Sequence, residues 1–357
     1  MAFPARLPFP ILAAPRFLAA LGLALGLGAA AQTADTAAHR AAVWIRPPGS
    51  PQELERTLVA AKQAGFTEVL LEGFYHGRAI WKSELAPMKL GYDALELASR
   101  VAVREGLGLN LWFETLYWRP APEFGIPVTP LWKDSYATLS AAGQTSLQLS
   151  RLGFVDPADS EVTTLLSGLS AELGRLYPQV GLHLDYLRYP READFGYHPA
   201  ALAAFLAQSG VDARVLARPD PGDEFAAERQ LWAAFRREQV TALAGRLIAS
   251  YRAAGGTGLV SAAVYGAADP LQDWRRWAGL QAAMPMLYYP LPALDRLTPF
   301  QFAPGDTVWP GIRVGAGSAP LAEQLALLRG LGYPNVAVFG WTSTGQRSEP
   351  QPPDRQP

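Results

Sequence analysis

The sequence predicts an α/β fold, a (β/α)8 or TIM barrel with long, elaborated loops. Strand-like and helix-like patterns alternate along the chain, and the number of expected strands reaches eight. A hydrophobic content of 49% and a charged content of 18% supply a chain of 357 residues with a sizeable core. We expect one barrel domain over residues 32–346 and a disordered Pro-rich tail at 347–357.

Residues 1–31 are expected to form a signal peptide. Arg6 and Arg16 precede the apolar run Phe17–Leu27, and small residues follow this run. The order of basic, apolar and small segments is typical of export, which predicts a location in the periplasm, the cell envelope or outside the cell. An uncleaved membrane anchor is the alternative, although the apolar run is short for a membrane span. With 0 Cys, the chain has no disulfide to support the core.

Each expected strand is a short apolar run between turn-forming or polar residues. The eight expected strands are Ala41–Arg46, Glu68–Glu72, Leu109–Glu114, Gly181–Asp185, Leu259–Val264, Ala283–Leu287, Thr307–Ile312 and Asn335–Phe339. The fourth shows the alternation most clearly. Leu182 and Leu184 share the face that helices should cover, because strand side chains alternate with period two. His183 and Asp185 therefore share the inner face.

Helix signals fill the intervals between these strands. Ser50, Pro51 and Glu53 form the clearest start, with a capping serine and a proline in the first turn. The expected helices are Ser50–Ala64, Tyr92–Glu105, Asp156–Tyr177, Arg229–Ala254, Gln272–Trp277 and Ala319–Leu331. Two connections are unusually long. Thr115–Phe154 is expected to be an elaborated loop over the site, and Arg191–Glu228 to contain a short helix.

Three expected strands end in inward-pointing carboxylates, Glu72, Glu114 and Asp185. Three such groups at one rim repel one another strongly unless they share a proton or a cation. The repulsion raises one pKa and makes that group a proton donor. Carboxylate pairs among aromatic side chains are typical of glycoside hydrolysis. The alternative for Glu72 is an ion pair with Arg46 or Arg78 that only shapes the pocket.

Aromatic residues are abundant, with 10 Trp, 13 Tyr and 15 Phe, and such side chains stack on the apolar faces of sugar rings. His183, Arg188 and Asp273 are expected to orient the carboxylates or to bind hydroxyl groups. The full set of expected substrate-binding residues is Trp44, Arg46, Trp112, His183, Arg188, Tyr189, Tyr265, Asp273, Tyr288 and Trp341.

Other chemistries find less support in the sequence. Only four His exist, and His183 with Asp185 would supply two metal ligands where a zinc site normally has three from the protein. We therefore expect no metal and no cofactor. There is no GxSxG motif and no Cys nucleophile. A net charge of −1 argues against nucleic acid as a partner, and the oligomeric state is left open.

Several short motifs follow one another in a recognisable order between Ala41 and Trp341. They are Ala42-Val43-Trp44-Ile45, Gly91-Tyr92-Asp93, Val155-Asp156-Pro157, His183-Leu184-Asp185-Tyr186-Leu187-Arg188-Tyr189-Pro190, Gln272-Asp273-Trp274 and Met284-Pro285-Met286-Leu287-Tyr288. This order resembles the glycosyl hydrolase-like family 10 group. The resemblance implies a bacterial exported TIM-barrel protein of a group regarded as glycosidases, some of them implicated in cell-wall glycan cleavage.

The chain departs from this group at two places. Many members carry Gln-Val-Arg where Glu72-Gly73-Phe74 stands here, and an acidic residue in place of Arg78. The resemblance therefore implies the barrel and leaves the substrate open.

Together these features predict an exported glycoside hydrolase that acts on a polysaccharide, with peptidoglycan glycan strands as a candidate. Asp185 would act as nucleophile or charge stabiliser and Glu114 as general acid/base. Their position at the ends of consecutive strands gives a weak preference for the short carboxyl separation of retaining enzymes. A carbohydrate-binding barrel of the cell envelope without turnover is the alternative, because the same aromatic side chains would serve both.

We predict that the signal is cleaved after Ala31, because Ala29 and Ala31 supply the small residues that the signal peptidase requires. N-terminal sequencing of the exported protein should find Gln32 as the first residue. A mature chain that still begins at Met1 would show that the segment is kept as an anchor.

Overall fold

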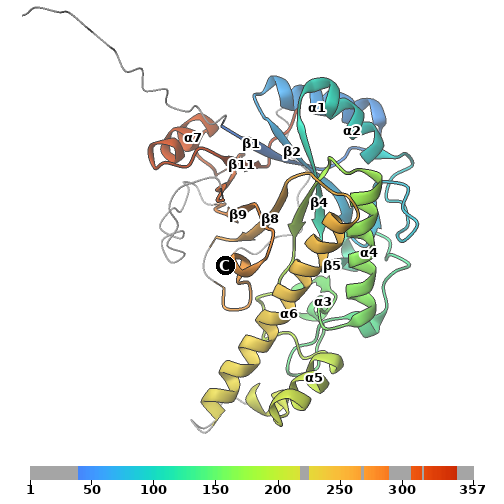
Figure 1. Ribbon diagram of the computed structural model, residues 1–357, viewed down its shortest axis with the longest axis vertical. Helices are drawn as coiled ribbons and strands as arrows, with labels where there is room; N and C mark the ends of the chain where they lie inside the picture. Colours follow the sequence, from blue (N-terminus) through green and yellow to red (C-terminus); the bar gives the residue numbers. More distant parts are fainter. Residues whose placement is uncertain (1–38, 218–224, 267–268, 289–306, 316, 344–357) are drawn as a thin grey trace, which may run out of the picture. The chain divides into compact units, whose positions relative to one another are not determined.

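The computed structural model describes residues 39–217, 225–266, 269–288, 307–315 and 317–343. Within these residues eight parallel strands form a closed barrel, which confirms the predicted fold (Figure 1). The strands, in their order around the barrel, are β1 (Ala41–Ile45), β2 (Glu68–Tyr75), β4 (Gly108–Glu114), β7 (Gly181–Asp185), β8 (Val260–Tyr265), β9 (Ala282–Met286), β10 (Gly311–Arg313) and β11 (Val336–Phe339). Pairing of β1 with both β2 and β11 closes the ring.

Helices lie outside the ring of strands (Figure 1). They are α1 (Pro51–Gln63), α2 (Ala94–Glu105), α4 (Ser160–Leu176), α6 (Ala226–Ala253) and α7 (Leu321–Gly330). The capping residues explain where they begin. Ser50 accepts a hydrogen bond from the backbone N–H of Glu53, and Asp93 does the same for Glu96. None of the helices in these described ranges has the length and apolar character needed to cross a bilayer.

Two apolar layers follow from the strand alternation. Leu182 and Leu184 lie in the outer layer between strands and helices, as predicted. The inner layer fills the barrel itself, and its buried members are Ala42, Trp44, Leu70, Trp112, Ala263, Ala282, Met284, Trp309 and Ala337. The part of the barrel interior that the structure describes is thus packed with side chains.

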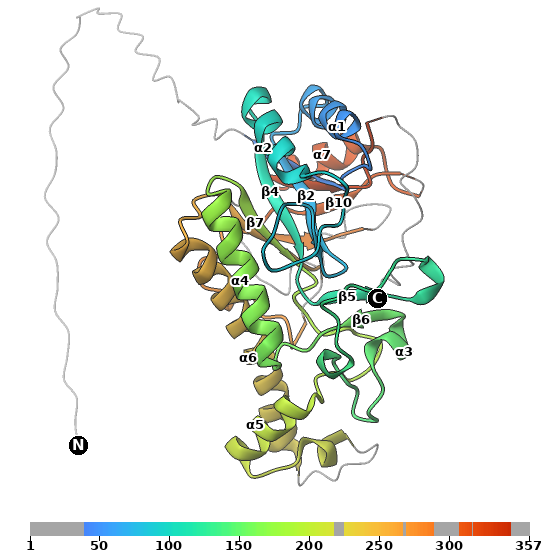
Figure 2. The same cartoon turned by 90° about the vertical axis from the view of Figure 1, so that its right-hand side faces the viewer.

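The two long connections carry structure of their own. The first contains the antiparallel pair β5 (Tyr117–Pro120) and β6 (Leu152–Phe154), together with η1 (Pro122–Phe124), η2 (Asp134–Tyr136) and α3 (Ser146–Ser150). The second contains α5 (Pro199–Ser209) and η3 (Ala213–Ala217). Trp232 of α6 packs against Phe205 of α5, and Figure 2 shows α5 beside the first turns of α6, away from the strands.

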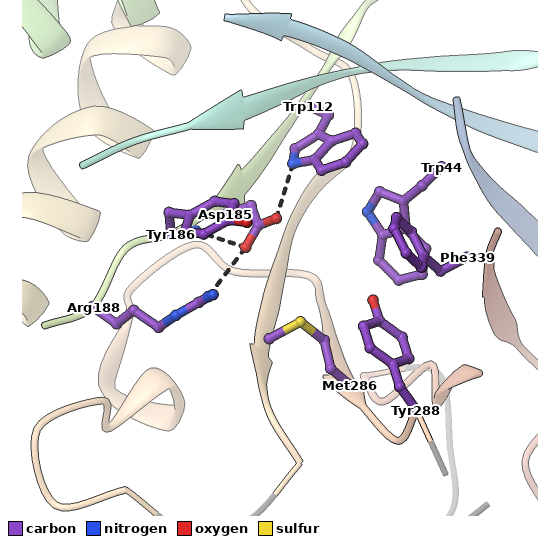
Figure 3. Close-up of a pocket in the computed structure, with 8 residues that line it drawn as sticks. All are labelled: Trp44, Trp112, Asp185, Tyr186, Arg188, Met286, Tyr288 and Phe339. Atoms are coloured by element: carbon purple, nitrogen blue, oxygen red, sulfur yellow. Dashed lines mark hydrogen bonds and ion pairs between the residues drawn. The ribbon is translucent and has the colours of Figure 1, made fainter. Parts of the chain in front are cut away.

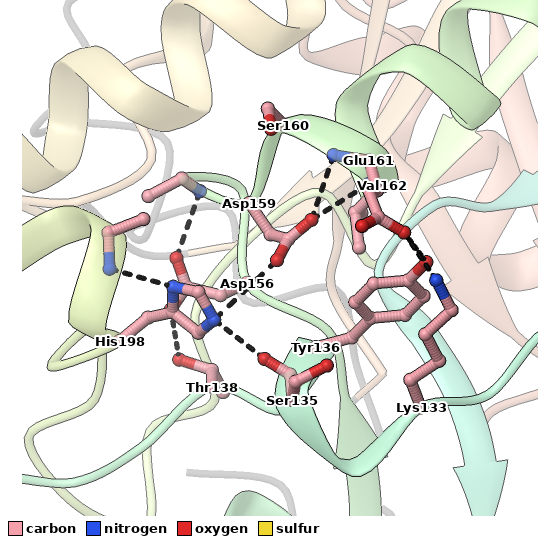
Figure 4. Close-up of polar contacts among 12 residues, drawn as sticks. Lys133, Ser135, Tyr136, Thr138, Asp156, Asp159, Ser160, Glu161, Val162 and His198 are labelled. Atoms are coloured by element: carbon pink, nitrogen blue, oxygen red, sulfur yellow. Dashed lines mark hydrogen bonds and ion pairs between the residues drawn. The ribbon is translucent and has the colours of Figure 1, made fainter.

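A buried polar network ties these connections to α4 (Figure 4). The Thr138 hydroxyl donates to Asp156 Oδ2 at 2.6 Å, and the Ala158 N–H donates to Asp156 Oδ1 at 2.9 Å. His198 from the second connection bonds the backbone carbonyl of Ser135 in the first at 2.7 Å. Segments separated by more than 60 residues in sequence are therefore held together by hydrogen bonds that solvent does not weaken.

Most element boundaries differ from the prediction by one to three residues; β2, for example, continues past the expected end at Glu72 to Tyr75. Three differences are larger or change the type of element. The helix expected to begin at Asp156 begins at Ser160, because Asp159 is its capping residue. The Asp156 carboxylate instead accepts hydrogen bonds from Thr138 and Ala158. The short helix expected at 272–277 is the 3₁₀ turn η5 (Trp274–Arg276). The seventh strand begins at Gly311 rather than Thr307, because Pro310 has no N–H for a strand ladder.

Candidate active site

A hollow opens where the strands end at their carboxyl termini, and it holds about 310 Å³ of space including its open mouth (Figure 3). Its walls are mostly aromatic. The lining residues are Trp44, Trp112, Asp185, Tyr186, Arg188, Met286, Tyr288 and Phe339. They come from β1, β4, β7, β9 and β11 and the segments that follow them. This carboxyl end is where (β/α)8 barrels assemble their binding sites.

Asp185 is the acidic group of this hollow. Its Oδ2 accepts a hydrogen bond from Trp112 Nε1 at 2.9 Å, and its Oδ1 accepts from the Tyr186 N–H at 2.6 Å. Arg188 Nη1 lies 3.2 Å from the same Oδ1. These three donors fix the carboxylate in one orientation with its charge stabilised.

The backbone leaves β7 through a strained residue. Tyr186 has a φ of 52°, in the left-handed region that bulky side chains rarely occupy. This turn directs the Tyr186 N–H onto Asp185 and places the Arg188 guanidinium over two rings. Arg188 lies 4.6 Å from the centre of the Tyr186 ring and 4.9 Å from that of Tyr265. Cation–π contacts and the ion pair thus hold Arg188 beside Asp185.

His183 lies one layer below the hollow and is fully buried. Trp44 Nε1 donates to His183 Nε2 at 3.0 Å, and Ser261 Oγ lies 2.9 Å from His183 Nδ1. Burial lowers the pKa of His183 to about 3, so the ring is neutral. Since Nε2 accepts from Trp44, Nδ1 carries the proton and donates to Ser261. His183 therefore positions the Trp44 indole and does not reach a ligand.

Glu72 and Glu114 form a second acidic group beside Asp185. Arg46 Nε lies 3.2 Å from Glu72 Oε1, whereas Glu114 Oε2 is buried without a hydrogen-bond partner among the described residues. Burial, followed by repulsion from Glu72, raises the pKa of Glu114 well above its usual range, and Asp185 adds to the effect. Burial also raises the pKa of Glu72, but Arg46 opposes that shift, so a proton is favoured on Glu114.

The strand register confirms that Glu114 and Asp185 lie side by side, since these two residues are direct partners in the pairing of β4 with β7. An irregularity in β2 places Glu72 next to them. The pairing of β2 with β4 shifts between Glu72 and Phe74. Gly73 occupies the shift, where a Cβ atom would come within 1.8 Å of the Leu111 side chain. Bulges of this kind re-aim side chains near binding sites.

The structure brings most of the predicted site residues together. Five of them line the hollow: Trp44, Trp112, Asp185, Arg188 and Tyr288. Arg46 lies beside it with its guanidinium 5.9 Å from the centre of the Trp112 ring, and Tyr265 supports Arg188. Glu72 and Glu114 belong to the same end of the barrel but are buried and do not line the hollow.

Three predicted binding residues lie elsewhere. Tyr189 is buried, with its ring packed against Gly196. Asp273 immediately precedes the η5 turn outside the hollow. The predicted inward orientation of Trp341 is wrong, because Gly340 takes a φ of 83° and breaks the alternation. Trp341 instead packs against Phe66 in the outer layer, with ring centres 5.3 Å apart.

Three lining residues were not on the predicted list: Tyr186, Met286 and Phe339. The alternation already placed Phe339 on the inner face at the end of its strand, which is the signal that could have identified it. Met286 follows the inward Met284 by two residues, so the same reasoning applies. Tyr186 has no such signal, because its orientation depends on the positive φ that follows β7.

The described residues contain no group of three or more His, Cys, Asp or Glu side chains that could bind a metal ion. Acid–base chemistry by the carboxyls is what the site can perform with its own residues. A carboxyl group held by three donors and a second one with a raised pKa lie on adjacent strands next to an aromatic surface, and such a combination can donate a proton and stabilise positive charge.

Comparison with solved structures finds the same fold in two enzymes. The catalytic domain of beta-amylase from Paenibacillus polymyxa superposes with a TM-score of 0.58 and 11% identity, over 87% of this chain and 95% of that chain. Beta-galactosidase from the psychrophilic Marinomonas ef1 gives 0.54 and 13% identity, over 85% of this chain and 54% of that chain. No protein-family model and no curated protein sequence matches the chain. The likeness supports the barrel, and the family inferred from the motifs stays a prediction.

Glu114 should make the folded state less stable as the pH rises. Its folded-state pKa lies above the value of about 4.3 for an unfolded glutamate, so stability is fully present below that value and is lost as the pH rises through the folded pKa. Glu114→Gln removes this titration. In urea unfolding, the free energy of unfolding of the variant should increase relative to that of the wild type as the pH is raised above about 4.3. Glu96→Gln, at an exposed position, is the control, and a constant difference across this range would contradict the raised pKa.

Tyr288 and Trp341 should respond differently to truncation. Tyr288→Ala removes a hollow-lining ring and should weaken glycan binding by about 1 kcal/mol, or roughly fivefold, in calorimetric titration. Trp341→Ala should leave glycan binding unchanged and lower the melting temperature, because that ring packs on Phe66. Loss of affinity in Trp341→Ala with unchanged stability would show that Trp341 contacts the ligand.

Proposed function

We propose that this protein is an exported glycoside hydrolase that cleaves a polysaccharide, with peptidoglycan glycan strands as the first substrate to test. The observation that carries the proposal is the aromatic hollow at the carboxyl end of the barrel, which holds Asp185 next to a buried carboxyl pair. The likeness to beta-amylase and beta-galactosidase and the motif resemblance to the glycosyl hydrolase-like family 10 group support the same function.

Asp185 is the group that faces the ligand. Its charge is stabilised by Arg188 and by the N–H groups of Trp112 and Tyr186. In glycoside hydrolysis a carboxylate in this place either attacks the anomeric carbon or stabilises the positive charge that develops there. The fixed orientation of Asp185 favours both roles, since no reorganisation is needed at the moment of reaction.

Glu114 is the proton donor in this proposal. Its raised pKa favours the protonated form that a general acid needs, and Asp185 lies on the adjacent strand as the second carboxyl group. Adjacent strands lie about 4.8 Å apart, close to the carboxyl separation of about 5 Å in retaining glycosidases. Because Glu114 is buried, its side chain has to turn from Glu72 toward the hollow when a substrate is bound.

One observation favours a second function, a carbohydrate-binding barrel without turnover. Asp185 and Glu72 are each paired with an arginine, and Glu114 does not line the hollow. Such an arrangement can recognise sugar hydroxyls through Arg188 and stack sugar rings on Tyr288 without any proton transfer. The two functions share their ligand and differ in whether a glycosidic bond breaks.

Export is part of the proposal and is supported by the basic, apolar and small segments of residues 1–31. The protein would meet its polysaccharide in the periplasm, the cell envelope or outside the cell. The decisive experiment is a product assay on purified glycan strands, read by mass spectrometry. New reducing ends support hydrolysis, and binding without new ends supports the second function.

Asp185→Asn and Glu114→Gln should each fold and each lose about two or more orders of magnitude in hydrolysis rate, the usual scale for an acid–base group. Added azide should restore turnover in the variant that lacks the nucleophile. Asp273→Asn is the matched control outside the hollow. If both variants keep near-wild-type rates while the control behaves normally, the pair is not catalytic, and Glu72 becomes the next residue to replace.

A further inference from the structure

Arg46 lies at the edge of the hollow, and only one nitrogen of its guanidinium is hydrogen-bonded among the described residues. Its Nε is engaged by Glu72 at 3.2 Å, and among the described residues its two Nη groups have no hydrogen-bond partner. The side chain is 43% exposed, whereas that of Glu72 is 3% exposed. The guanidinium lies over Trp112, a ring that lines the hollow. Arg46 therefore offers free donors next to a surface on which a sugar ring can stack.

A second cation, Lys89, lies close to the same carboxyls. Its ammonium group is 4.5 Å from the centre of the Tyr75 ring and 3.4 Å from His76 Nδ1. Burial, with help from Lys89, lowers the pKa of His76 to about 3, so His76 is neutral and accepts from the lysine. Burial lowers the pKa of Lys89, and the neighbouring Glu72 and Glu114 oppose this shift.

Arg46 is the cation here that can reach a ligand. Glu72 engages only its Nε, and its side chain is exposed, whereas Arg188 is buried and paired with Asp185. A fork of free N–H donors fits a carboxylate better than any neutral sugar group.

We propose that Arg46 is a specificity-determining residue that binds the carboxylate of an acidic sugar, next to the unit that stacks in the hollow. The inference rests on the proposed function and adds the substrate class, a polysaccharide with free carboxyl groups. The carboxylate bonds the two Nη groups of Arg46 while Glu72 keeps Nε. Trp112 supports the apolar face of the same sugar unit.

Two polysaccharides serve as probes: polygalacturonate fragments and purified glycan strands. Each is compared with its methyl ester, which has the same backbone but no negative charge. Calorimetric titration of the wild type should show at least one probe bound about tenfold more tightly than its ester. The preference should shrink as salt is raised, because an exposed arginine is screened. Equal affinity for both forms of each bound probe overturns the inference.

Substitutions of Arg46 test whether this residue causes the preference for the charged form of a probe. Arg46→Gln should bring the ratio of the two affinities close to one, and Arg46→Lys, which keeps the charge without the fork, should retain part of it. Arg78→Gln is the matched control, an arginine whose guanidinium bonds the Val128 carbonyl. If Arg46→Gln unfolds because Glu72 loses its cation, Arg46→Gln with Glu72→Gln removes both charges and tests the same ratio. A ratio that stays at the wild-type value in these variants overturns the assignment.

The same probes separate this inference from the proposed function. Cleavage of both forms at equal rates would uphold glycoside hydrolysis and overturn the acidic-sugar site. Preferential binding of the charged form without cleavage would uphold the Arg46 site and overturn hydrolysis. No binding of either form of either probe would overturn the Arg46 site as proposed, and hydrolysis would then rest on the product assay.

Discussion

The mouth of this barrel is governed by the burial of three carboxyl groups on adjacent strands. Burying an isolated ionised carboxylate costs far more than the net stability of a domain can supply. Each group is therefore compensated in its own way. Glu72 is matched by Arg46 and Asp185 by Arg188 with two N–H donors, whereas the raised pKa of Glu114 favours its neutral form. The positions of the arginines follow from this requirement.

The aromatic side chains of the hollow combine support with recognition. The N–H ends of Trp44 and Trp112 are fixed by His183 and Asp185, so their ring faces are held in place toward the hollow. Because His183 is neutral over the whole working range of pH, it remains an acceptor for Trp44. The stacking surface is thus preorganised, which lowers the entropy cost of binding a flexible polysaccharide.

Elements far apart in the sequence hold the segment that follows β7. The strained turn at Tyr186 persists because Asp185, Arg188 and Tyr265 each make contacts that depend on it. His198 joins the second long connection to the Ser135 carbonyl of the first, and Asp156 holds Thr138 of the first connection. Such local strain is typical of functional sites, where the surrounding packing compensates for it.

The sequence by itself determined the barrel and the identity of its inward carboxyls. Period-two alternation is a property of the local backbone, so it correctly placed Glu114 and Asp185 at the ends of their strands and Leu182 on the outer face. The expected strand end at Glu72 was wrong, because β2 continues to Tyr75. Helix starts were equally local, since Ser50 needs only its own neighbours to form a cap. Both were predictable without any knowledge of the tertiary structure.

Tertiary structure decided which residues those side chains contact. The positive φ of Gly340 turns Trp341 away from the hollow, and packing against Gly196 buries Tyr189. The alternation of side chains along a strand predicts neither outcome. The raised pKa of Glu114 depends on its burial and on Glu72, which lies 42 positions away in the sequence. Periodicity fixes the face that a side chain occupies, whereas its partners, and hence its charge and its role, come from strands and loops that only the closed barrel brings together.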